Sequence, residues 1–387
     1  MVGHASIDGI TKLHSLRICR GSQDSDRRPQ MTIHGIVLTL SIALLAAPPW
    51  ASAQQLQPST SKPGLSASSD RIHLDVVVNT KDDRLVSNLR QQDFTILDNK
   101  SPRPITSFRV VTSAQEPVEV IVLIDAVDTP YEMVSYARDQ TERFLKANEG
   151  TLAHPTNIAI LTDQGVQITS GFSTDGNAIS EVLQHHVIAL REITRASQWG
   201  ANDRLTVCLK DLHQIVAYAS TLPGRKLLLY ISPGWPLLSG PDVILDSRQL
   251  QQIFDSVVFF SSQLRQSKIA LYDVNPFGFS ESMLAANYYQ TFLKGITKRS
   301  DAQYADLSLQ VLAVQSGGLT ITASTDIAAN IQKCLNDANS WYEITFDPPP
   351  RDKPNEYHHL EVRLDQPGLI ARSRDGYYSN TVAVPAH

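Results

Sequence analysis

Cysteine is scarce in this sequence, with three residues in 387. Cleavage of an N-terminal leader would remove Cys19 and leave Cys208 and Cys334, on two predicted helices far apart in the chain. These two residues cannot build a metal cluster. An oxidising compartment would permit one disulfide between them. Two separate buried thiols are the favoured alternative, because free cysteine is among the most buried residue types.

The sequence also lacks an excess of positive charge. Its 34 Lys and Arg residues are interspersed among 39 Asp and Glu residues, which gives a formal net charge of -5. Without a polybasic face, neither nucleic acid nor an anionic membrane surface is expected as a partner.

Long hydrophobic runs are absent except for one near the N-terminus, Gly35–Ala47. It is followed by two prolines and by Ala51-Ser52-Ala53, a small-x-small cleavage pattern, so it predicts a signal peptide. The start is either Met31 or further upstream, with Arg27 and Arg28 as the basic region of a longer leader. Gln54, rather than cysteine, stands at the cleavage site, which argues against a lipid anchor. No other stretch reaches the roughly 20 apolar residues of a membrane span, so the mature protein is expected to be exported, periplasmic or extracellular, without a span.

Familiar catalytic motifs are absent as well. The sequence contains no Gly-x-Ser-x-Gly, His-Glu-x-x-His or Gly-x-x-x-x-Gly-Lys motif. We therefore expect a protein that is not an enzyme, with an exported hydrolase as the alternative.

Composition and patterning divide the chain into five segments. Residues 1–53 are the leader, and the Ser, Pro and Gln content of residues 54–69 is typical of a flexible linker. Short alternating strands predict a small β module over residues 70–114. A domain in which strands and helices alternate follows over residues 115–338. Strand patterns return in a C-terminal extension, residues 339–387.

The long central segment predicts an α/β fold. Its strand candidates are Val118–Asp125, Asn157–Thr162, Val166–Thr169, Lys226–Ser232, Ile269–Val274 and Leu319–Ala323. Its helix candidates are Tyr131–Ala147, Asn177–Arg191, Leu205–Leu222, Leu245–Gln266, Ala302–Gln315 and Ile327–Ala338. Helical crossovers favour a mostly parallel six-stranded sheet with helices on both faces. The turn Asp163-Gln164-Gly165 predicts a hairpin and hence one antiparallel strand.

The apolar run that ends at Asp125 is the strand whose carboxyl end predicts a ligand site. An α/β sheet with one hairpin, opened by such a strand, resembles a von Willebrand factor type A domain. More narrowly, Leu85–Phe108 (LVSNLRQQDFTILDNKSPRPITSF) and Leu369–Ser379 (LIARSRDGYYS) resemble the VWFA-related proteins that are abundant in Acidobacteria. The resemblance implies a protein–protein interaction or adhesion-like module.

Type A domains usually hold a divalent ion with an Asp-x-Ser-x-Ser loop, a threonine and a further aspartate. Here Asp125 and Thr129 match the first and last positions of the loop, but Val127 replaces the middle serine and Pro233 stands where the later aspartate belongs. The resemblance therefore implies a degenerate metal site, and we expect no cofactor. A rearranged Mg²⁺ or Ca²⁺ site is the alternative, with Asp125, Asp128, Thr129, Asn202 and Asp203 as ligands. Asn202 and Asp203 also suit the cap of a helix that begins near Leu205.

Aromatic and acidic residues after later strands are candidates for binding a protein partner. Trp235 lies between two prolines, Asp273 closes a strand, and Phe277 and Phe279 follow it. Aromatic side chains exposed at the carboxyl edge of the sheet would be suitable anchors, whereas packing against the sheet would make them part of the core.

Overall fold

The structure is a computed structural model, and it describes residues 71–185, 198–236, 244–277, 288–322, 324–350 and 353–379. All of them belong to one compact unit, residues 64–387. The predicted leader and linker lie outside the described residues. Within the described residues, no helix is both long and apolar enough to cross a membrane.

A mostly parallel sheet lies at the centre of this unit. Its strands are β5 (Glu119–Asp125), β6 (Thr151–Thr162), β7 (Gly165–Ile168), β8 (Ser173–Asp175), β9 (Lys226–Ile231), β10 (Ile269–Val274) and β11 (Thr320–Ile321). The order is β11-β10-β9-β5-β6-β7, and β8 also pairs with β6. The sheet thus has seven strands; the six predicted ones are present and β8 is additional. The predicted hairpin is confirmed, because β6 and β7 pair antiparallel around residues 163–164.

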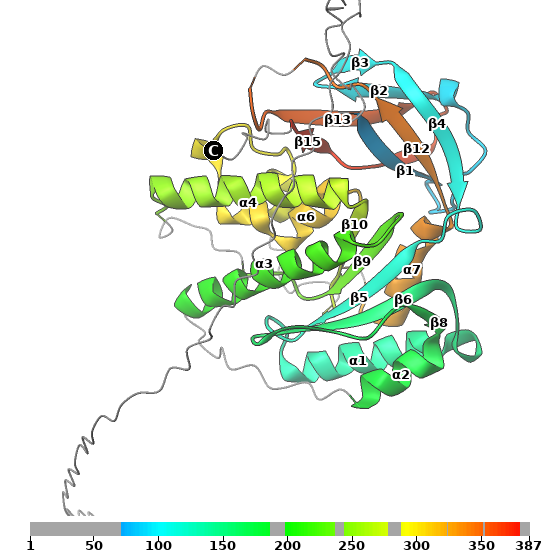
Figure 1. Cartoon of the computed structure of the whole chain (residues 1–387), viewed down its shortest axis with the longest axis vertical. Helices are drawn as coiled ribbons and strands as arrows, with labels where there is room; N and C mark the ends of the chain where they lie inside the picture. The colour runs from blue at the N-terminus through cyan, green and yellow to red at the C-terminus, as the bar shows by residue number, and fades with distance from the viewer. Residues whose placement is uncertain are drawn as a thin grey trace, which may run out of the picture. The chain divides into compact units, whose positions relative to one another are not determined.

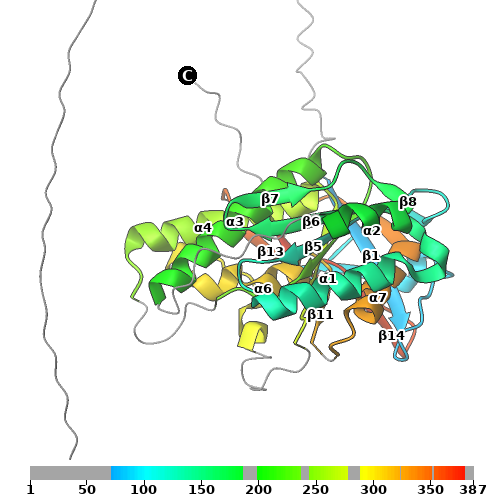
Figure 2. The same cartoon turned by 90° about the horizontal axis from the view of Figure 1, so that it is seen from below.

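Helices cover both faces of this sheet (Figure 1). One hydrophobic core contains buried residues of α1 (Tyr131–Leu145), α2 (Gly176–His185) and α7 (Ile327–Asn339). The opposite core contains those of α3 (Gln198–Ser220), α4 (Ser247–Gln266) and α6 (Leu309–Gln315). Figure 2 shows α1 and α2 in front of the sheet from below. The 3₁₀ turns are η1 (Gln91–Asp93), η2 (Ala147–Gly150), η3 (Tyr288–Phe292), η4 (Arg299–Asp301) and η5 (Tyr304–Leu307).

Local sequence explains these elements well. Every residue of β5 after Glu119 is buried, and its side chains alternate between the two cores. Such a strand needs apolar residues on both faces. Asp246 caps the N-terminus of helix α4, and its Oδ1 accepts the backbone N–H groups of Arg248 and Gln249 at 2.8 Å each. Its buried residues, Ile253, Val257, Phe260 and Leu264, recur at helical spacing and form the packed face.

The first and last parts of the described chain together form a β-sandwich. Its strands are β1 (Ile72–Thr80), β2 (Phe94–Asp98), β3 (Ser101–Arg103), β4 (Ile105–Thr112), β12 (Ser340–Phe346), β13 (Tyr357–Leu364), β14 (Leu369–Arg372) and β15 (Gly376–Tyr378). The two sheets have the orders β14-β1-β12-β4 and β15-β13-β2-β3. The predicted β module and C-terminal extension therefore share both sheets. A third core, which includes Leu74, Phe94, Tyr342 and Leu360, lies between them.

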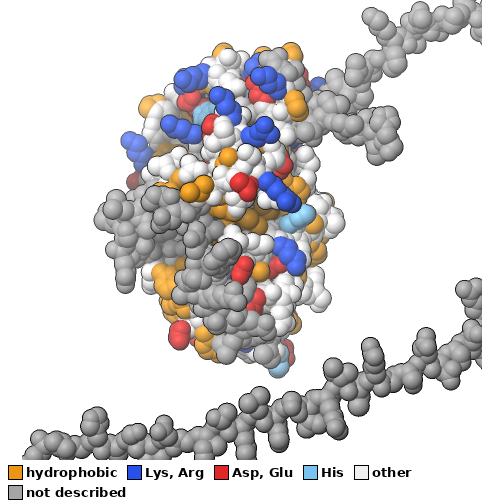
Figure 3. Space-filling model, turned by 90° about the vertical axis from the view of Figure 1, so that its left-hand side faces the viewer, with side chains coloured by type: hydrophobic (Ala, Val, Ile, Leu, Met, Phe, Trp, Pro, Cys, Tyr) orange, Lys and Arg blue, Asp and Glu red, His pale blue; other side chains and the backbone are white. Residues whose placement is uncertain are grey.

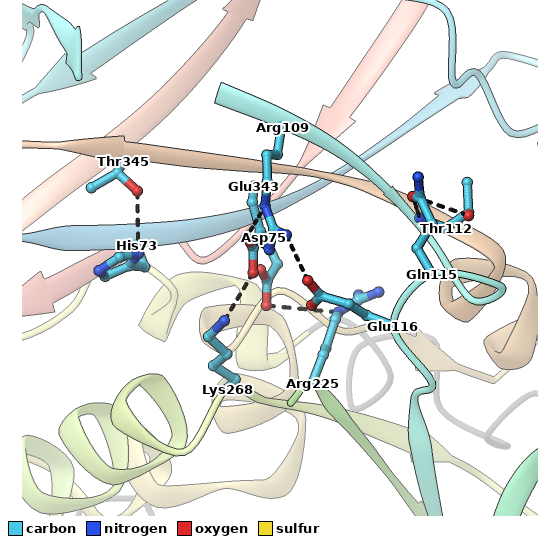
Figure 4. Close-up of polar contacts among 10 residues, drawn as sticks. All are labelled: His73, Asp75, Arg109, Thr112, Gln115, Glu116, Arg225, Lys268, Glu343 and Thr345. Atoms are coloured by element: carbon cyan, nitrogen blue, oxygen red, sulfur yellow. Dashed lines mark hydrogen bonds and ion pairs between the residues drawn. The ribbon is translucent and has the colours of Figure 1, made fainter. Parts of the chain in front are cut away.

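Arg225 joins the sandwich to the central sheet (Figure 4). It immediately precedes β9 and is only 4% exposed. One of its Nη atoms donates to the backbone oxygen of Asp337 at 2.6 Å, and its Nε lies 3.8 Å from an oxygen of Asp75 in β1. Its guanidinium also lies 5.0 Å from the ring centroid of Trp341. One buried cation thus contacts β1, α7 and β12.

A second set of ion pairs surrounds Glu343 of β12 (Figure 4). Lys268, which precedes β10, donates to Glu343 at 2.8 Å, and Arg109 of β4 forms a further ion pair with it. Arg109 also pairs with Glu116 at 2.6 Å. Burial acts to raise the pKa of Glu343, but the hydrogen bonds from Lys268 and Arg109 outweigh it and lower the pKa. The carboxylate is therefore charged at neutral pH.

Cys208 and Cys334 are both buried and free. Cys208 belongs to the core of α3 and α4, whereas Cys334 belongs to the core on the opposite face of the sheet. The favoured prediction of two separate core thiols is confirmed.

Candidate functional site

Three loops follow the carboxyl ends of neighbouring strands β5, β9 and β10, and we call them the rim: residues 125–131, 232–236 and 275–277. Parallel sheets bind their ligands at this edge. The first loop folds around the Asp125 carboxylate, whose Oδ1 accepts the backbone N–H groups of Val127 at 2.8 Å and Asp128 at 3.0 Å. This arrangement is a turn closed by an aspartate side chain.

The second rim loop contacts the first through Ser232. Its Oγ donates to Asp125 Oδ2 at 2.9 Å and accepts the N–H of Gly234 at 3.2 Å. Gly234 has a φ of 97°, and a Cβ there would lie 2.3 Å from Nε2 of Gln310. Only glycine suits this position, which fixes the loop against α6.

Asp128 is held by two side chains of α3. Nε of Arg204 donates to its Oδ1 at 2.8 Å, and the thiol of Cys208 donates to its Oδ2 at 3.1 Å. Arg204 and Cys208 are four residues apart and so lie on the same side of the helix. The side chains of Asp128 and Arg204 are 5% and 16% exposed, so this ion pair is largely removed from water.

Burial controls the protonation of these groups. It raises the pKa of Asp125 to about 7, aided by the charge of Asp128, while the hydrogen bonds from Asp128, Ser232 and Val127 act in the opposite direction. Burial also raises the pKa of the Cys208 thiol well above its usual range, with further contributions from the charges of Asp125 and Asp128. Cys208 is therefore a neutral hydrogen-bond donor at physiological pH.

Substituting Asp125 with asparagine should weaken the pH dependence of stability. With a folded pKa of about 7 against an ordinary value of 3.8, the folded state retains a proton that the unfolded state releases. The stabilisation is therefore complete below about pH 4 and is lost as pH rises through 7. The amide in Asp125→Asn would resemble the protonated acid, so urea unfolding should show a loss between pH 5 and pH 8 that is smaller by about 3 kcal/mol in the variant. Equal losses in both proteins would contradict the raised pKa.

The predicted metal ligands form a poor site for Mg²⁺ or Ca²⁺. Potential ligand atoms of Asp125, Asp128 and Cys208 lie within 4.8 Å of one another. One feature suits a ligand: Thr129 is buried, and its hydroxyl has no hydrogen-bond partner among the described residues. However, hard cations need about six oxygen ligands, and the third group here is a thiol. Arg204 already provides Asp128 with positive charge, so the donor set does not fit either ion.

Asn202 and Asp203 do not occupy a loop before a helix. Helix α3 begins at Gln198, so both residues lie within it, and the predicted start near Leu205 is wrong. The backbone oxygen of Asn202 accepts the hydroxyl of Thr206 at 2.8 Å, and the Asp203 side chain is exposed. The helix starts earlier because its apolar face includes Ala201, which packs against the core beside Leu205. The predicted capping role is also wrong.

Trp235 is not an exposed anchor. It is 3% exposed, and its indole N–H donates to the Tyr230 hydroxyl at 3.2 Å. The two rings pack edge to face with centroids 5.7 Å apart. The indole therefore lies in the core between the flanking prolines, and the predicted partner-binding role of Trp235 is wrong.

The remaining partner candidates differ in exposure. Asp273 is fully buried, and burial raises its pKa well above the usual range, so it does not present a charge to a partner. Phe277 is 40% exposed, and its backbone N–H is held by the side chain of Asn275 at 2.8 Å. Phe279 lies outside the described residues.

Arg204, Cys208 and Ser232 are the site residues that sequence reasoning missed. The sequence contained a signal for Arg204 and Cys208. Residues Leu205, Cys208 and Leu212 continue the apolar spacing of α3, and these three are buried. A helix extended towards the N-terminus on this pattern includes Arg204, on the same side as Cys208. Ser232 stands at the end of a predicted strand, next to Pro233, and the sequence gives no sign that its hydroxyl contacts Asp125.

Comparison with known proteins finds distant structural similarity. No protein-family model matches the sequence, and no curated protein matches it. Similar solved structures include proximal thread matrix protein 1 from the mussel byssus, with 11% identity, a TM-score of 0.33 and coverage of 60% of this chain. This chain spans about half, 48%, of that protein. The VWA domain of SpRpn10 has 10% identity and a TM-score of 0.29, covering 58% of this chain and 98% of that domain. Manganese-loaded TRAP protein of Plasmodium vivax has 10% identity and a TM-score of 0.30, covering 70% and 96%.

Proposed function

We propose that this protein is an exported, non-enzymatic protein–protein interaction module of the von Willebrand factor type A kind, and that its rim works without a divalent ion. Support for the type A assignment comes from the mostly parallel sheet with one antiparallel hairpin, and from the position of Asp125 at the carboxyl end of β5. The signal-peptide pattern before residue 54 supports periplasmic or extracellular localisation.

The narrower resemblance to VWFA-related proteins of Acidobacteria rests on two segments of the sandwich. Leu85–Phe108 includes β2, β3 and the first half of β4, and Leu369–Ser379 includes β14 and β15. In the described structure these segments contribute strands to both sheets. The resemblance thus concerns the sandwich, whereas the proposed binding edge belongs to the central sheet.

The interaction proposal depends on one observation: the acidic groups of the rim are bonded within the protein, whereas two of its aromatic side chains are exposed to solvent. The carboxylates of Asp125 and Asp128 are bonded within the protein. Tyr131 and Phe277, by contrast, are 55% and 40% exposed. Large exposed aromatic side chains at the ligand edge of a sheet are suited to anchor a protein partner.

Site-specific photo-crosslinking in cells that export the protein would test this proposal. A photoreactive residue at Phe277 or Tyr131 should form crosslinks to a protein partner. The same residue at Ile370 of β14, which is 55% exposed but distant from the rim in the chain topology, serves as the control. Crosslinks from Ile370 alone, or from none of the three positions, would overturn the assignment of the rim as the binding edge.

The main rival is a binder that needs Mg²⁺ or Ca²⁺, and a metal titration separates the two. Calorimetric titration of the mature protein with either ion should give no binding heat, because Arg204 already forms an ion pair with Asp128. The melting temperature should also stay unchanged, since an ion that binds the folded state would raise it. Heat that is present in the wild type and disappears in Asp125→Ala would establish the metal-dependent alternative.

We propose no catalytic step for the rim. The Ser232 hydroxyl is hydrogen-bonded to a carboxylate there, but its Oγ donates to Asp125 and accepts from Gly234. Nucleophilic catalysis needs a hydroxyl that a base activates towards substrate, with a third group that orients the base. The arrangement of Ser232 instead supports a structural role, which favours the interaction module over an exported hydrolase.

A further inference from the structure

A cavity of about 570 Å³ opens at one end of the sandwich, away from the Asp125 loop. It is lined by Arg90, Gln91, Gln92, Phe94, Thr95, Arg103 and Ile105. Phe94 is buried and Ile105 is half-buried, so the cavity has an apolar floor. Arg90 and Arg103 also line the cavity. This composition is suited to an apolar ligand that carries an anionic group.

The cavity lies where the chain passes from one sheet to the other. Strand β3 pairs with β2 only over Ile96–Asp98, so Phe94 and Thr95 extend past the end of β3. The chain then continues into β4, which belongs to the opposite sheet. The part of β2 that extends past the end of the edge strand β3 offers space for an added extended segment.

Arg103 is positioned by a buried cluster behind it. Asp98, which is fully buried, accepts a hydrogen bond from the Tyr377 hydroxyl at 2.9 Å and lies 2.9 Å from Nδ1 of His358. The rings of His358 and Tyr377 stack, with centroids 4.7 Å apart. This packing holds the Asp98 carboxylate in place.

The guanidinium of Arg103 is not satisfied by this cluster. Its Nε is 3.7 Å from the nearer Asp98 oxygen, beyond hydrogen-bond distance, and this atom is buried without a hydrogen-bond partner among the described residues. The side chain as a whole is 26% exposed. Asp98 therefore keeps the guanidinium at the cavity wall, and the exposed part of the Arg103 side chain is left to donate to a ligand.

Arg90 provides a second cation at the same cavity. Its backbone N–H is bonded to Asp93 at 2.7 Å, which fixes the start of the η1 turn, and its side chain is exposed. No ion pair joins its guanidinium to another of the described residues. Figure 3 shows Lys and Arg side chains, with Asp and Glu side chains among them, over the sandwich end of one face of the molecule.

We propose that this cavity binds an extended acidic peptide segment, with Arg90 and Arg103 on a carboxylate and Phe94 and Ile105 against a neighbouring apolar side chain. A guanidinium recognises a carboxylate through two parallel hydrogen bonds, a geometry that lysine does not reproduce. The apolar floor selects against a free inorganic anion. This site is separate from the rim and does not depend on the function proposed for it.

Fluorescence anisotropy with a labelled, end-blocked peptide Val-Glu-Val-Glu-Val tests the proposal. The peptide should bind the mature protein saturably, and raised salt should weaken binding. Arg90→Ala and Arg103→Lys should each weaken it by roughly tenfold, the effect of losing one charge-assisted hydrogen bond. Arg84→Ala is the matched control, because Arg84 is an exposed arginine of the same sandwich whose ion pair is with Asp82. It should leave binding unchanged.

Four results would overturn the proposal. The first is equal binding of the neutral peptide Val-Gln-Val-Gln-Val, which would show that no carboxylate is recognised. The second is unchanged affinity in Arg90→Ala together with a circular dichroism spectrum that shows a folded protein. The third is competition by inorganic phosphate at the same concentration as the peptide, which would indicate a simple anion site. Absence of saturable binding at about 1 mM peptide would also reject it, since this corresponds to only about 4 kcal/mol of binding free energy.

Discussion

Replacing Arg204 with methionine is expected to destabilise the folded protein by about 3 kcal/mol. Methionine keeps much of the side-chain volume but removes the cation that pairs with Asp128 at 2.8 Å. Asp128, with a side chain 5% exposed, would then be a buried charge beside Asp125. Removing one partner of a buried pair is costly because the other charge stays desolvated. Equilibrium unfolding in urea at pH 8, above the pKa of Asp125, measures the effect.

An exposed ion pair elsewhere in the molecule provides the control for Arg204. Arg143 pairs with Asp326 at the surface, with side chains 56% and 45% exposed. Arg143→Met should cost less than about 1 kcal/mol, as exposed pairs usually do. If the two variants lost equal stability, the Arg204–Asp128 pair would not be the organising contact of the rim.

Replacing Arg225 with methionine should have a similarly large effect, at about 3 kcal/mol. Arg225 is 4% exposed and donates to the backbone oxygen of Asp337 at 2.6 Å. Its loss would leave that oxygen and the Asp75 carboxylate without their buried cation, and would remove the contact with the Trp341 ring. Because these groups lie where the sandwich meets the central sheet, differential scanning calorimetry should show a lower melting temperature.

Arg109 offers the matched control for Arg225 because it lies in the adjoining ion-pair network. Its side chain is 53% exposed, and Lys268 continues to pair with Glu343 when Arg109 is removed. Arg109→Met should therefore cost less than about 1 kcal/mol. If Arg109→Met lost as much stability as Arg225→Met, burial would not determine how strongly these residues stabilise the contact between the sandwich and the central sheet.

The central α/β layer was predictable from sequence because its signals are local. An apolar run such as β5 identifies a doubly buried strand, and the periodic spacing in α4 identifies a helix with one packed face. The strand β8 escaped prediction because Ser173–Asp175 has no apolar pattern, and only its pairing with β6 makes it a strand. Similarly, β3 and β15 are three-residue strands defined by their neighbours.

The pairing within the sandwich could not be predicted for a different reason. Alternation of apolar residues indicates which face of a strand is buried, but it does not identify the neighbouring strand. β1 pairs with β12 and β14, which lie more than 250 residues further along the chain. No local pattern contains that information.

Prediction of the candidate site succeeded for position and failed for chemistry. The strand end placed Asp125 correctly on the carboxyl edge of the sheet. Its surroundings depend on α3, which begins seven residues before the expected start at Leu205 and so brings Arg204 and Cys208 against Asp128. The burial of Trp235 could not be predicted from the sequence either, because proline rigidity does not determine the direction of an indole ring.

The interleaved sandwich has a consequence for how the chain matures. While the ribosome is still extending the chain, β1 lacks both of its partner strands and β2 is paired with β3 alone, because β12, β13 and β14 emerge much later. Pairings of such high contact order form slowly and late. Until then the apolar faces of the early strands are unprotected, which is a characteristic aggregation hazard. A nascent chain that stalls after α7 would complete the central sheet and yet leave the sandwich without half of its strands.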